Sequence, residues 1–231
     1  MNLLESLRGG LIVSVQAAPG SPLDDPTVIA AMAAAAQAAG AVGLRIQGVA
    51  NLQAVRERVQ VPIIGLIKRG YPGIGPYITP SLLEVEEILA TGAQIVAFDA
   101  TPRSRPQSQT IAQLIARIRE GGAIAMADCA RTADGRAAQA AGAQILATTL
   151  CGYTEQTAEI VLPALELVAE LAKLNAFCIC EGGVYSPDLA GRAVAAGADA
   201  VVVGTAITGL EWVTAGFVSE ISRIADNRRN I

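Results

Sequence analysis

The sequence predicts a single α/β domain over residues 1–231, folded as a (β/α)8 barrel with parallel strands. Three observations predict it. Short apolar runs alternate with helical patterns eight times, a glycine-containing string recurs before every second run, and 231 residues is near the usual size of one such barrel. The composition agrees, because 52% hydrophobic but only 3% aromatic residues suit small-residue helices packed on an aliphatic parallel sheet.

Eight apolar runs have the length and composition of buried strands, and helical patterns lie between them. The expected strands are Leu11–Gln16, Gly43–Gln47, Pro62–Lys68, Gln94–Asp99, Ala123–Asp128, Gln144–Thr149, Ala176–Glu181 and Ala200–Gly204. The expected helices include Thr27–Ala39, Leu52–Val59, Ser81–Ala90, Ile111–Glu120, Arg131–Ala140, Pro163–Leu174, Pro187–Ala196 and about Ala215–Ile224. Two helix starts carry their own signals. Glu84 follows Ser81 at the spacing of a capping box, and Pro187 follows Ser186 at an expected first helical position.

An internal repeat supports one closed array of β/α units. A glycine flanked by Ala or Thr and by Ala precedes the second, fourth, sixth and eighth expected strands, at Gly40, Gly92, Gly142 and Gly197. These glycines are 52, 50 and 55 residues apart, which is two β/α units each time. A glycine just past a helix end supplies the left-handed conformation that other residues resist, so we expect a helix cap at each.

The charge balance and the missing residue types exclude several classes of function. A formal net charge of −4 argues against a nucleic-acid partner, and no apolar run is long enough to span a membrane. We therefore expect a cytoplasmic protein without a signal peptide. The four cysteines follow no metal-ligand spacing and are expected to be reduced and buried. Histidine is absent, so proton chemistry must use Lys, carboxylate, Tyr or Cys.

Polar residues end the apolar runs, at the edge of the barrel where active sites lie in this fold. Placing many polar groups there is costly unless they meet each other or a ligand, although solvated loop residues are the alternative interpretation. The residues are Gln16, Arg45, Gln47, Lys68, Asp99, Asp128, Thr148, Thr149, Glu181, Gly204 and Thr205.

Lys68 is the strongest catalytic candidate in this set. An apolar strand delivers its ammonium group into the mouth of the expected barrel, and burial lowers a lysine pKa toward the range of a general base. Glu181 also ends an apolar strand and is the best acid–base partner for Lys68, with a purely structural Lys–Glu ion pair as the rival interpretation.

The glycines after the last two strands suggest a phosphate site. Gly182-Gly183 and Gly204-Thr205 stand where barrels of this class often bind phosphate through backbone N–H groups. Arg45 is a candidate clamp for a substrate oxygen or for a carboxylate. Asp128 and Asp99 are candidates to orient Lys68 or to accept sugar hydroxyl groups. The Gly- and Pro-rich segment 69–79 is expected to be an ordered wall or lid of the site.

Together these motifs resemble the N-acetylmannosamine-6-phosphate 2-epimerase (N-acylglucosamine-6-phosphate 2-epimerase) family of bacterial amino-sugar metabolism. The resemblance runs through the chain in the right order. It is carried by Val13-Ser14-Val15-Gln16, Gly43-Leu44-Arg45-Ile46, Ile64-Gly65-Leu66-Ile67-Lys68-Arg69, Tyr77-Ile78-Thr79-Pro80, Asp99-Ala100-Thr101, Met126-Ala127-Asp128-Cys129, Gly152-Tyr153-Thr154, Glu181-Gly182-Gly183 and Val203-Gly204-Thr205-Ala206-Ile207-Thr208.

The resemblance implies a cofactor-free isomerase that interconverts N-acetylmannosamine 6-phosphate and N-acetylglucosamine 6-phosphate by inversion at C2. It implies that Lys68 is the catalytic base and that Glu181 assists it. It further implies that a subset of the quoted residues binds the sugar phosphate, and that the protein is a homodimer that takes no metal. The residues that would bind the sugar are Gln16, Arg45, Asp128 and Tyr153, while the expected phosphate residues are those assigned above from their place after the last two strands, Gly182, Gly183, Gly204 and Thr205.

One departure from the family pattern keeps two other functions open. Gly209 follows Thr208 where the resemblance leads one to expect an arginine. If that arginine contacts substrate in relatives, a catalytically inert sugar-phosphate-binding barrel is an alternative function. A strand-end lysine in a barrel can also form a Schiff base with a carbonyl, so an aldolase or lyase is the other alternative.

Overall fold

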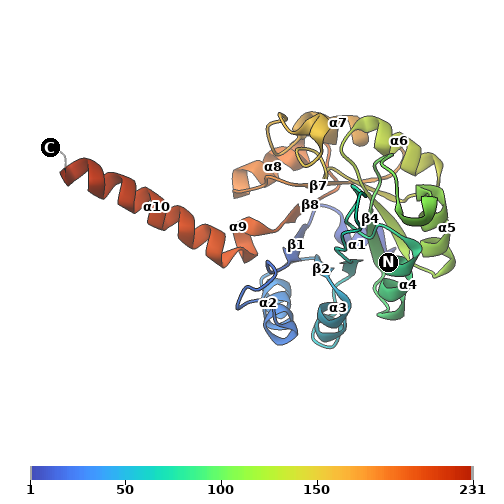
Figure 1. Ribbon diagram of the computed structural model, residues 1–231, viewed down its shortest axis with the longest axis horizontal. Helices are drawn as coiled ribbons and strands as arrows, with labels where there is room; N and C mark the ends of the chain where they lie inside the picture. Colours follow the sequence, from blue (N-terminus) through green and yellow to red (C-terminus); the bar gives the residue numbers. More distant parts are fainter. Residues whose placement is uncertain (1, 230–231) are drawn as a thin grey trace.

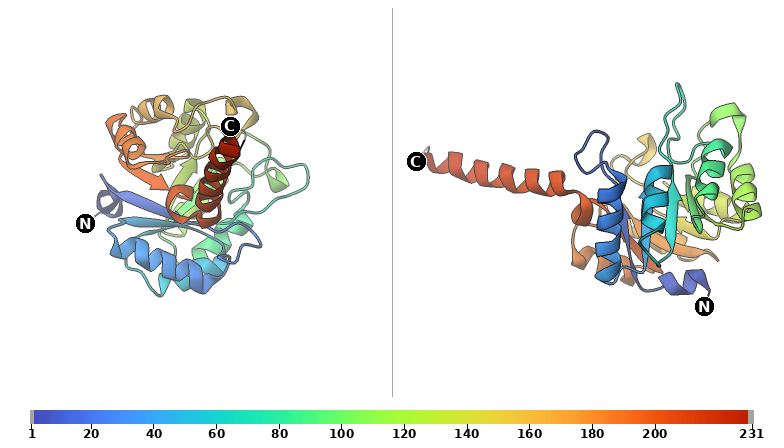
Figure 2. Two further views of the ribbon diagram at one scale, coloured as in Figure 1. Left: turned by 90° about the vertical axis from the view of Figure 1, so that its left-hand side faces the viewer. Right: turned by 90° about the horizontal axis from the view of Figure 1, so that it is seen from below.

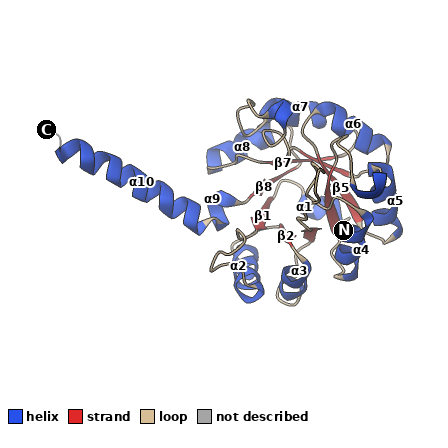
Figure 3. Ribbon diagram, in the orientation of Figure 1, coloured by secondary structure: helices blue, strands red, loops and turns tan. Residues whose placement is uncertain are grey.

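The computed structural model describes residues 2–229, and in these the chain forms a closed parallel barrel with helices around it (Figure 1). Each strand pairs in parallel with its sequence neighbours, and the last strand pairs with the first. Figure 3 shows the strands at the centre and the helices outside them. The (β/α)8 fold predicted from the sequence is therefore confirmed.

The elements alternate along the described residues as the sequence pattern indicates. The strands are β1 (Leu11–Val15), β2 (Gly43–Gln47), β3 (Ile63–Leu66), β4 (Ile95–Asp99), β5 (Ile124–Asp128), β6 (Ile145–Ala147), β7 (Phe177–Glu181) and β8 (Ala200–Val203). The helices are α1 (Leu3–Leu7), α2 (Pro26–Ala38), α3 (Val49–Arg56), α4 (Leu82–Ala90), α5 (Ile111–Glu120), α6 (Thr132–Ala140), α7 (Leu165–Leu171), α8 (Pro187–Ala195), α9 (Thr205–Thr208) and α10 (Leu210–Arg229), with short 3-10 turns at Pro106–Ser108 and Glu155–Thr157.

Several local predictions are confirmed. The capping box of Ser81 and Glu84 starts α4, and Pro187 is the first residue of α8. The four repeat glycines have φ between 75° and 110°, so each ends its helix in the left-handed conformation expected of it. Four strands, β1, β3, β6 and β8, end one or two residues earlier than predicted, and the other four end at the predicted residue. The predicted strands extend to the residue that ends each run, such as Gln16 or Lys68, and strand bounds vary by one or two residues at such positions.

Two layers of apolar side chains make the core. One layer fills the barrel and includes Ile12, Ile64, Met126 and Ile179, while the other packs between the strands and the helices. Leu7 of α1 is fully buried with the inner layer and so closes the bottom of the barrel. The sequence pattern did not predict α1, because five residues are too few to show a helical period.

The inner layer determines which polar residues reach the mouth of the barrel. Side chains alternate between the two faces of a strand, so residues two apart share a face. Ile64 and Leu66 point into the barrel, and the next inward position is Lys68. By the same alternation, Asp128 follows Met126 and Glu181 follows Ile179 on the inward face. The residues that fill the barrel thereby aim the candidate site residues at one another.

The last helix departs from the prediction in both length and position. A helix of about Ala215–Ile224 was expected, whereas α10 runs from Leu210 to Arg229 and projects away from the barrel (Figures 1 and 2). In the described part of the chain only the short helix α9 packs on the barrel between α8 and α2, because α10 leads away from β8 and β1 (Figure 1). The spacing of apolar residues in the sequence indicates that α10 has an apolar face, but it does not indicate what that face packs against.

Among residues 2–229, no helix has the length and apolar character required to cross a membrane.

Candidate active site

A cavity of about 230 Å³ opens at the carboxyl ends of the strands. Residues from β1, β2, β7 and β8 contribute to its wall, and so do the loops that follow β3, β6 and β7. It is lined by Ser14, Gln16, Arg45, Lys68, Tyr77, Ile78, Thr149, Tyr153, Glu181, Gly182, Gly183, Val184, Tyr185, Val202 and Gly204. Most of the residues singled out in the sequence therefore meet at one place.

Arg45 forms the charged centre of the floor. Its guanidinium group donates from Nη2 to Asp128 Oδ2 (2.6 Å) and from Nη1 to Asp128 Oδ1 (3.0 Å) and Glu181 Oε2 (2.6 Å). Arg45 is 1% exposed and Asp128 is fully buried. Burial alone would lower the pKa of Arg45, but the two carboxylates outweigh burial and hold the pKa above its ordinary value. Arg45 is thus a permanent buried cation.

Glu181 is held in place from two sides. Its backbone N–H donates to the Thr148 hydroxyl (3.0 Å), which itself donates to the Glu181 carbonyl (2.8 Å). The side chain accepts from Arg45 and lies 3.2 Å from the Thr149 hydroxyl. Burial raises the pKa of Glu181 to about 7, with Arg45 opposing the rise and Asp128 adding to it. Near neutral pH, Glu181 can therefore either hold or release a proton.

Lys68 stands beside this cluster at the mouth of the barrel. Desolvation by the walls lowers its pKa first, and the positive charge of Arg45 lowers it further, against the opposing carboxylates of Glu181 and Asp128. No ion pair holds Lys68 among the described residues. A lowered pKa increases the fraction of neutral amine, which is the form that can accept a proton.

The glycine pair after β7 has a backbone conformation that strongly favours glycine. Gly182 and Gly183 have φ of 102° and 71°, and a Cβ on Gly183 would lie 2.2 Å from Cβ of Leu162. Leu162 packs closely against Gly183, and both glycines line the cavity. Gly204, directly after β8, also lines the cavity, whereas Thr205 is the first residue of α9 and lines a neighbouring cavity.

The remaining candidates fall into three positions. Gln16 and Tyr153 line the cavity directly, and Gln16 also borders two adjoining cavities. Asp128 lies beneath Arg45 and is absent from the lining. Asp99 lies apart in a cluster with Arg103, Arg105 and Thr101 and does not line the cavity.

The segment after β3 forms an ordered wall. Arg69 N–H donates to the Tyr77 carbonyl (2.9 Å), and Lys68 and Ile78 form an antiparallel bridge. The Arg69 side chain pairs with Glu84 at 2.6 Å and with Glu87 at 2.9 Å. These contacts tie both ends of segment 69–79 to the barrel, so that Tyr77 and Ile78 border the site.

Sequence reasoning did not assign roles to several lining residues. Tyr77, Val184 and Tyr185 lie in loops after strands, where no periodic pattern indicates which way a side chain points. Ser14 lies inside a strand of mostly apolar residues. It is two residues after Ile12 and therefore on the same inward face, so the alternation of side chains could have identified it.

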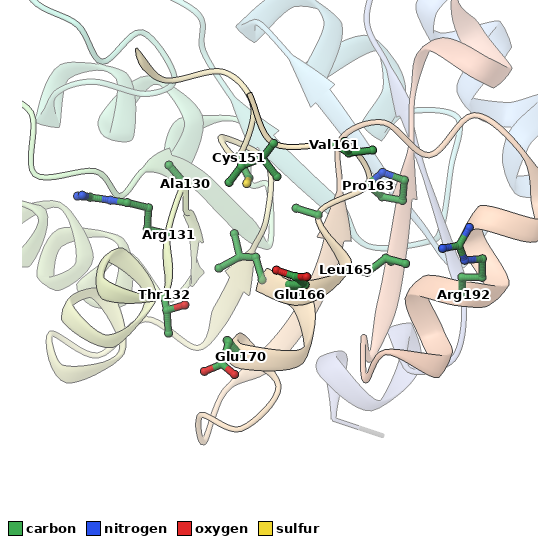
Figure 4. A pocket seen from close by; sticks show the side chains of 13 residues that line it. Ala130, Arg131, Thr132, Cys151, Val161, Pro163, Leu165, Glu166, Glu170 and Arg192 are labelled. Carbon is green, nitrogen blue, oxygen red and sulfur yellow. The ribbon is translucent and has the colours of Figure 1, made fainter. Parts of the chain in front are cut away.

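A larger cavity of about 760 Å³ lies elsewhere, between α6, α7 and α8 (Figure 4). It contains none of the residues predicted for the site. Its wall includes the exposed Val161 together with Arg131, Glu166 and Arg192, whose charged groups lie apart from one another in Figure 4. The strand-end cavity is the better candidate site because charged groups with shifted pKa values meet there. Among residues 2–229, no group of three or more Cys, Asp or Glu side chains lies where it could hold a metal ion.

Comparison with known proteins assigns the chain to a family. Residues 29–223 match the model of the family described as "Putative N-acetylmannosamine-6-phosphate epimerase". The chain belongs to this family. The resemblance found in the sequence motifs is therefore confirmed.

Individual relatives agree along almost the whole chain. "Putative N-acetylmannosamine-6-phosphate 2-epimerase" proteins of Yersinia pestis (strain Pestoides F) and Yersinia pseudotuberculosis serotype I (strain IP32953) are each 46% identical over 222 residues, covering 96% of this chain and 94% of the relative. The solved N-acetylmannosamine-6-phosphate 2-epimerase of Clostridium perfringens superposes with a TM-score of 0.92 at 36% identity, covering 95% of this chain and 96% of that one. A thiamine phosphate pyrophosphorylase from Pyrococcus furiosus (16% identity, TM-score 0.61, 90% of each chain) shares the fold alone.

Proposed function

We propose that this chain interconverts N-acetylmannosamine 6-phosphate and N-acetylglucosamine 6-phosphate by removing and replacing the proton on C2. Family membership supports this reaction. The observation that carries the proposal is the placement of Lys68, whose pKa is lowered, beside Glu181, whose pKa is raised to about 7, in one cavity at the barrel mouth. Two groups with pKa values shifted toward neutrality are what a reversible proton transfer requires.

The chemistry needs only groups that the chain supplies. In the open-chain aldehyde the C2 proton is acidic, because the carbonyl at C1 delocalises the electron pair left behind. Neutral Lys68 takes that proton as the C2–H bond breaks, and the negative charge develops on the C1 oxygen. The buried cation Arg45 stabilises this charge electrostatically. Protonated Glu181 then delivers a proton to C2 from the other face, which inverts the centre, and the two groups exchange roles in the reverse direction.

The same cavity, with the neighbouring cavity that Thr205 lines, offers groups for binding. Backbone N–H groups around Gly182, Gly183, Gly204 and Thr205 would hold the 6-phosphate, as the sequence suggested. Gln16 and Tyr153 would contact the sugar. Asp128 would act on the substrate through Arg45, since the two bond directly beneath the cavity.

Proton exchange in deuterated water tests the assignment of both catalytic groups. Each sugar phosphate is offered separately to the wild type, Lys68→Ala and Glu181→Gln, and C2 deuteration and epimerisation are followed by proton NMR. We expect both variants to lose epimerisation, while each still exchanges the epimer whose C2 proton faces the remaining group. Lys173→Ala, which removes the other lysine of the chain, is the control and should behave as wild type. Undiminished epimerisation in Lys68→Ala would contradict the proposal.

The same samples separate the two alternatives. Borohydride added with substrate would trap a Schiff base on Lys68 as a mass increase, which the epimerase mechanism does not produce. Binding without C2 exchange in the wild type would indicate the inert sugar-phosphate barrel. No observation in the fold or the comparisons favours either alternative.

We further propose that the protein is a homodimer held by α10. This helix is 20 residues long, or about 30 Å, and lies outside the barrel (Figure 2). Leu210, Phe217, Ile221 and Ile224 form an apolar stripe along one face of α10, and all four are exposed. A stripe of this kind needs a partner surface. We propose the flank between α8 and α2 of a second copy as that surface, because no long helix of the same copy covers it in Figure 1.

Light scattering on a sizing column tests the dimer. We expect a dimer for the wild type and a monomer, or a poorly soluble protein, for Phe217→Asp. Ser219→Asp adds the same charge on the opposite face of α10 and should stay dimeric. A wild-type monomer would contradict the proposal.

We also propose a cytoplasmic location, because a sugar 6-phosphate is a charged metabolite that membranes retain inside the cell.

A further inference from the structure

The first turn of α10 contacts two of the loops that wall the candidate site. The ring of Trp212 stacks on the ring of Tyr185, with centroids 5.3 Å apart and planes inclined by 17°. One residue earlier, Glu211 accepts a hydrogen bond from the Ser21 hydroxyl in the loop between β1 and α2. The Tyr185 loop follows β7 and carries the glycine pair. The helix is therefore joined to the site on both sides of β8.

Tyr185 belongs to the site itself. It lines the strand-end cavity four residues after Glu181 and two residues after Gly183. Its side chain is 50% exposed, so the loop alone leaves it rotational freedom. Stacking against a second aromatic ring restricts that freedom, because offset aromatic pairs prefer one arrangement over others. Trp212 is the neighbour that supplies this restraint.

The start of α10 is held firmly enough to act as such a restraint. The Thr208 hydroxyl donates to the Ser14 carbonyl of β1 (2.9 Å), which anchors α9 to the barrel wall. Gly209 then joins α9 to α10 where a Cβ would lie 2.8 Å from the Thr205 carbonyl oxygen. A larger residue would push the two helices apart at this junction. The absence of a side chain at Gly209 thus sets where Trp212 stands.

Trp212 is also separate from the proposed dimer contact. At 3.6 residues per turn it lies on the opposite side of α10 from Phe217 and Ile221 of the apolar stripe. Its function in the monomer and the function of the stripe in assembly can therefore be perturbed independently.

We propose that Trp212 is a positioning residue that holds Tyr185 across the mouth of the site and so strengthens binding of the sugar phosphate. Trp212 does not line the strand-end cavity itself but lines the neighbouring cavity with Gln16 and Thr205, and its ring contact with the strand-end cavity is through Tyr185. This inference rests on the proposed function, because the ligand it concerns is that of the same site.

Steady-state kinetics give the first test, with Trp212→Ala, Trp212→Phe and Leu83→Ala compared with the wild type. Because an aromatic pair of this geometry is lost in Trp212→Ala, we expect its KM to be about three- to tenfold higher than that of the wild type, with kcat little changed. Trp212→Phe keeps an aromatic ring and should have a KM near that of the wild type. Leu83→Ala truncates a side chain of matched exposure (54% against 56%) on α4 and should leave KM unchanged. A merely structural role would lower stability or the active fraction, and hence kcat. An unchanged KM in Trp212→Ala would overturn the proposal.

The pairing with Tyr185 gives the second test. If Trp212 acts through that ring, the double variant Trp212→Ala/Tyr185→Ala should have the KM of Tyr185→Ala alone, and additive effects would overturn the proposal. Trp212 is the single tryptophan of the chain, so its fluorescence reports binding directly. Titration with N-acetylglucosamine 6-phosphate should change the emission saturably in the wild type and not in Tyr185→Ala. Fluorescence requires no turnover, so a protein that binds but does not epimerise would contradict the proposed function and leave this inference testable.

Discussion

The stability of Glu181→Gln relative to the wild type is expected to increase as the pH rises. The quantity compared is the free energy of unfolding of the variant minus that of the wild type. The pKa of Glu181 rises from 4.5 in the unfolded chain to about 7 in the fold. A group whose pKa is raised by folding contributes stability below its unfolded pKa, and that contribution is lost as the pH rises through the folded pKa. Glutamine resembles the protonated carboxyl at every pH, so the variant should not suffer the loss.

The size of the effect follows from the shift. At about 1.36 kcal/mol per pKa unit, ionising the folded Glu181 costs about 3 kcal/mol that the unfolded chain does not lose. The difference in unfolding free energy, Glu181→Gln minus wild type, should therefore increase by about that amount between pH 4.5 and pH 8. Most of the increase should occur below pH 7, where folded Glu181 is still protonated and the unfolded carboxyl is already ionised.

Urea denaturation at fixed protein concentration measures this difference at several pH values, and taking the difference cancels every group common to both proteins. Glu170→Gln is the control. Its exposed carboxylate pairs with Lys173, which lowers the pKa of Glu170, so its contribution is present at neutral pH and lost toward acid. The unfolding free energy of this control, relative to the wild type, should not increase with rising pH. A pH-independent difference for Glu181→Gln would refute the assignment of a raised pKa.

Three further results are expected. Arg45→Met should destabilise the fold by about 3–5 kcal/mol in urea denaturation, because it leaves buried Asp128 without a counter-charge, and adding Asp128→Asn should recover part of the loss. Gly183→Ala should lower the free energy of unfolding by about 1–3 kcal/mol and remove most substrate binding, because φ at this position is positive and the added Cβ would collide with Leu162. Stability and binding near wild type would show that the turn can relax. The rate of C2 exchange, followed by NMR against pH, should rise as Lys68 loses its proton with a midpoint below the ordinary pKa of 10.5, and a midpoint at or above that value would contradict the lowered pKa.

Much of the site follows from the residue pattern and the alternation of side chains. Ile64, Leu66 and Lys68 form one inward-facing series, and Ile179 and Glu181 form another, so knowing that the strands close into a barrel brings Lys68 and Glu181 to the same mouth. The repeat glycines likewise indicate their own conformation, because a helix end that needs positive φ selects glycine whatever surrounds it.

Other features depend on neighbours that are distant in the sequence. The raised pKa of Glu181 results from burial beside Asp128, 53 positions away along the chain, and burial is a property of the assembled barrel. Tyr185 and Tyr77 enter the site from loops, where no period indicates the direction of a side chain. Asp99 ends its strand as Asp128 does, yet Arg103 and Arg105 pair with it away from the cavity.

The sequence by itself determined the fold class, the order of the strands and the family, because these depend on local periodicity and on motifs that each stand within a few residues. Only the tertiary structure decided the direction of α10, the stacking of Trp212 on Tyr185 and the charge balance around Lys68. The physical reason is the range of the interactions. Hydrophobic periodicity and helix capping act over a few residues, whereas desolvation and electrostatic energies depend on every group that the fold brings within several ångströms.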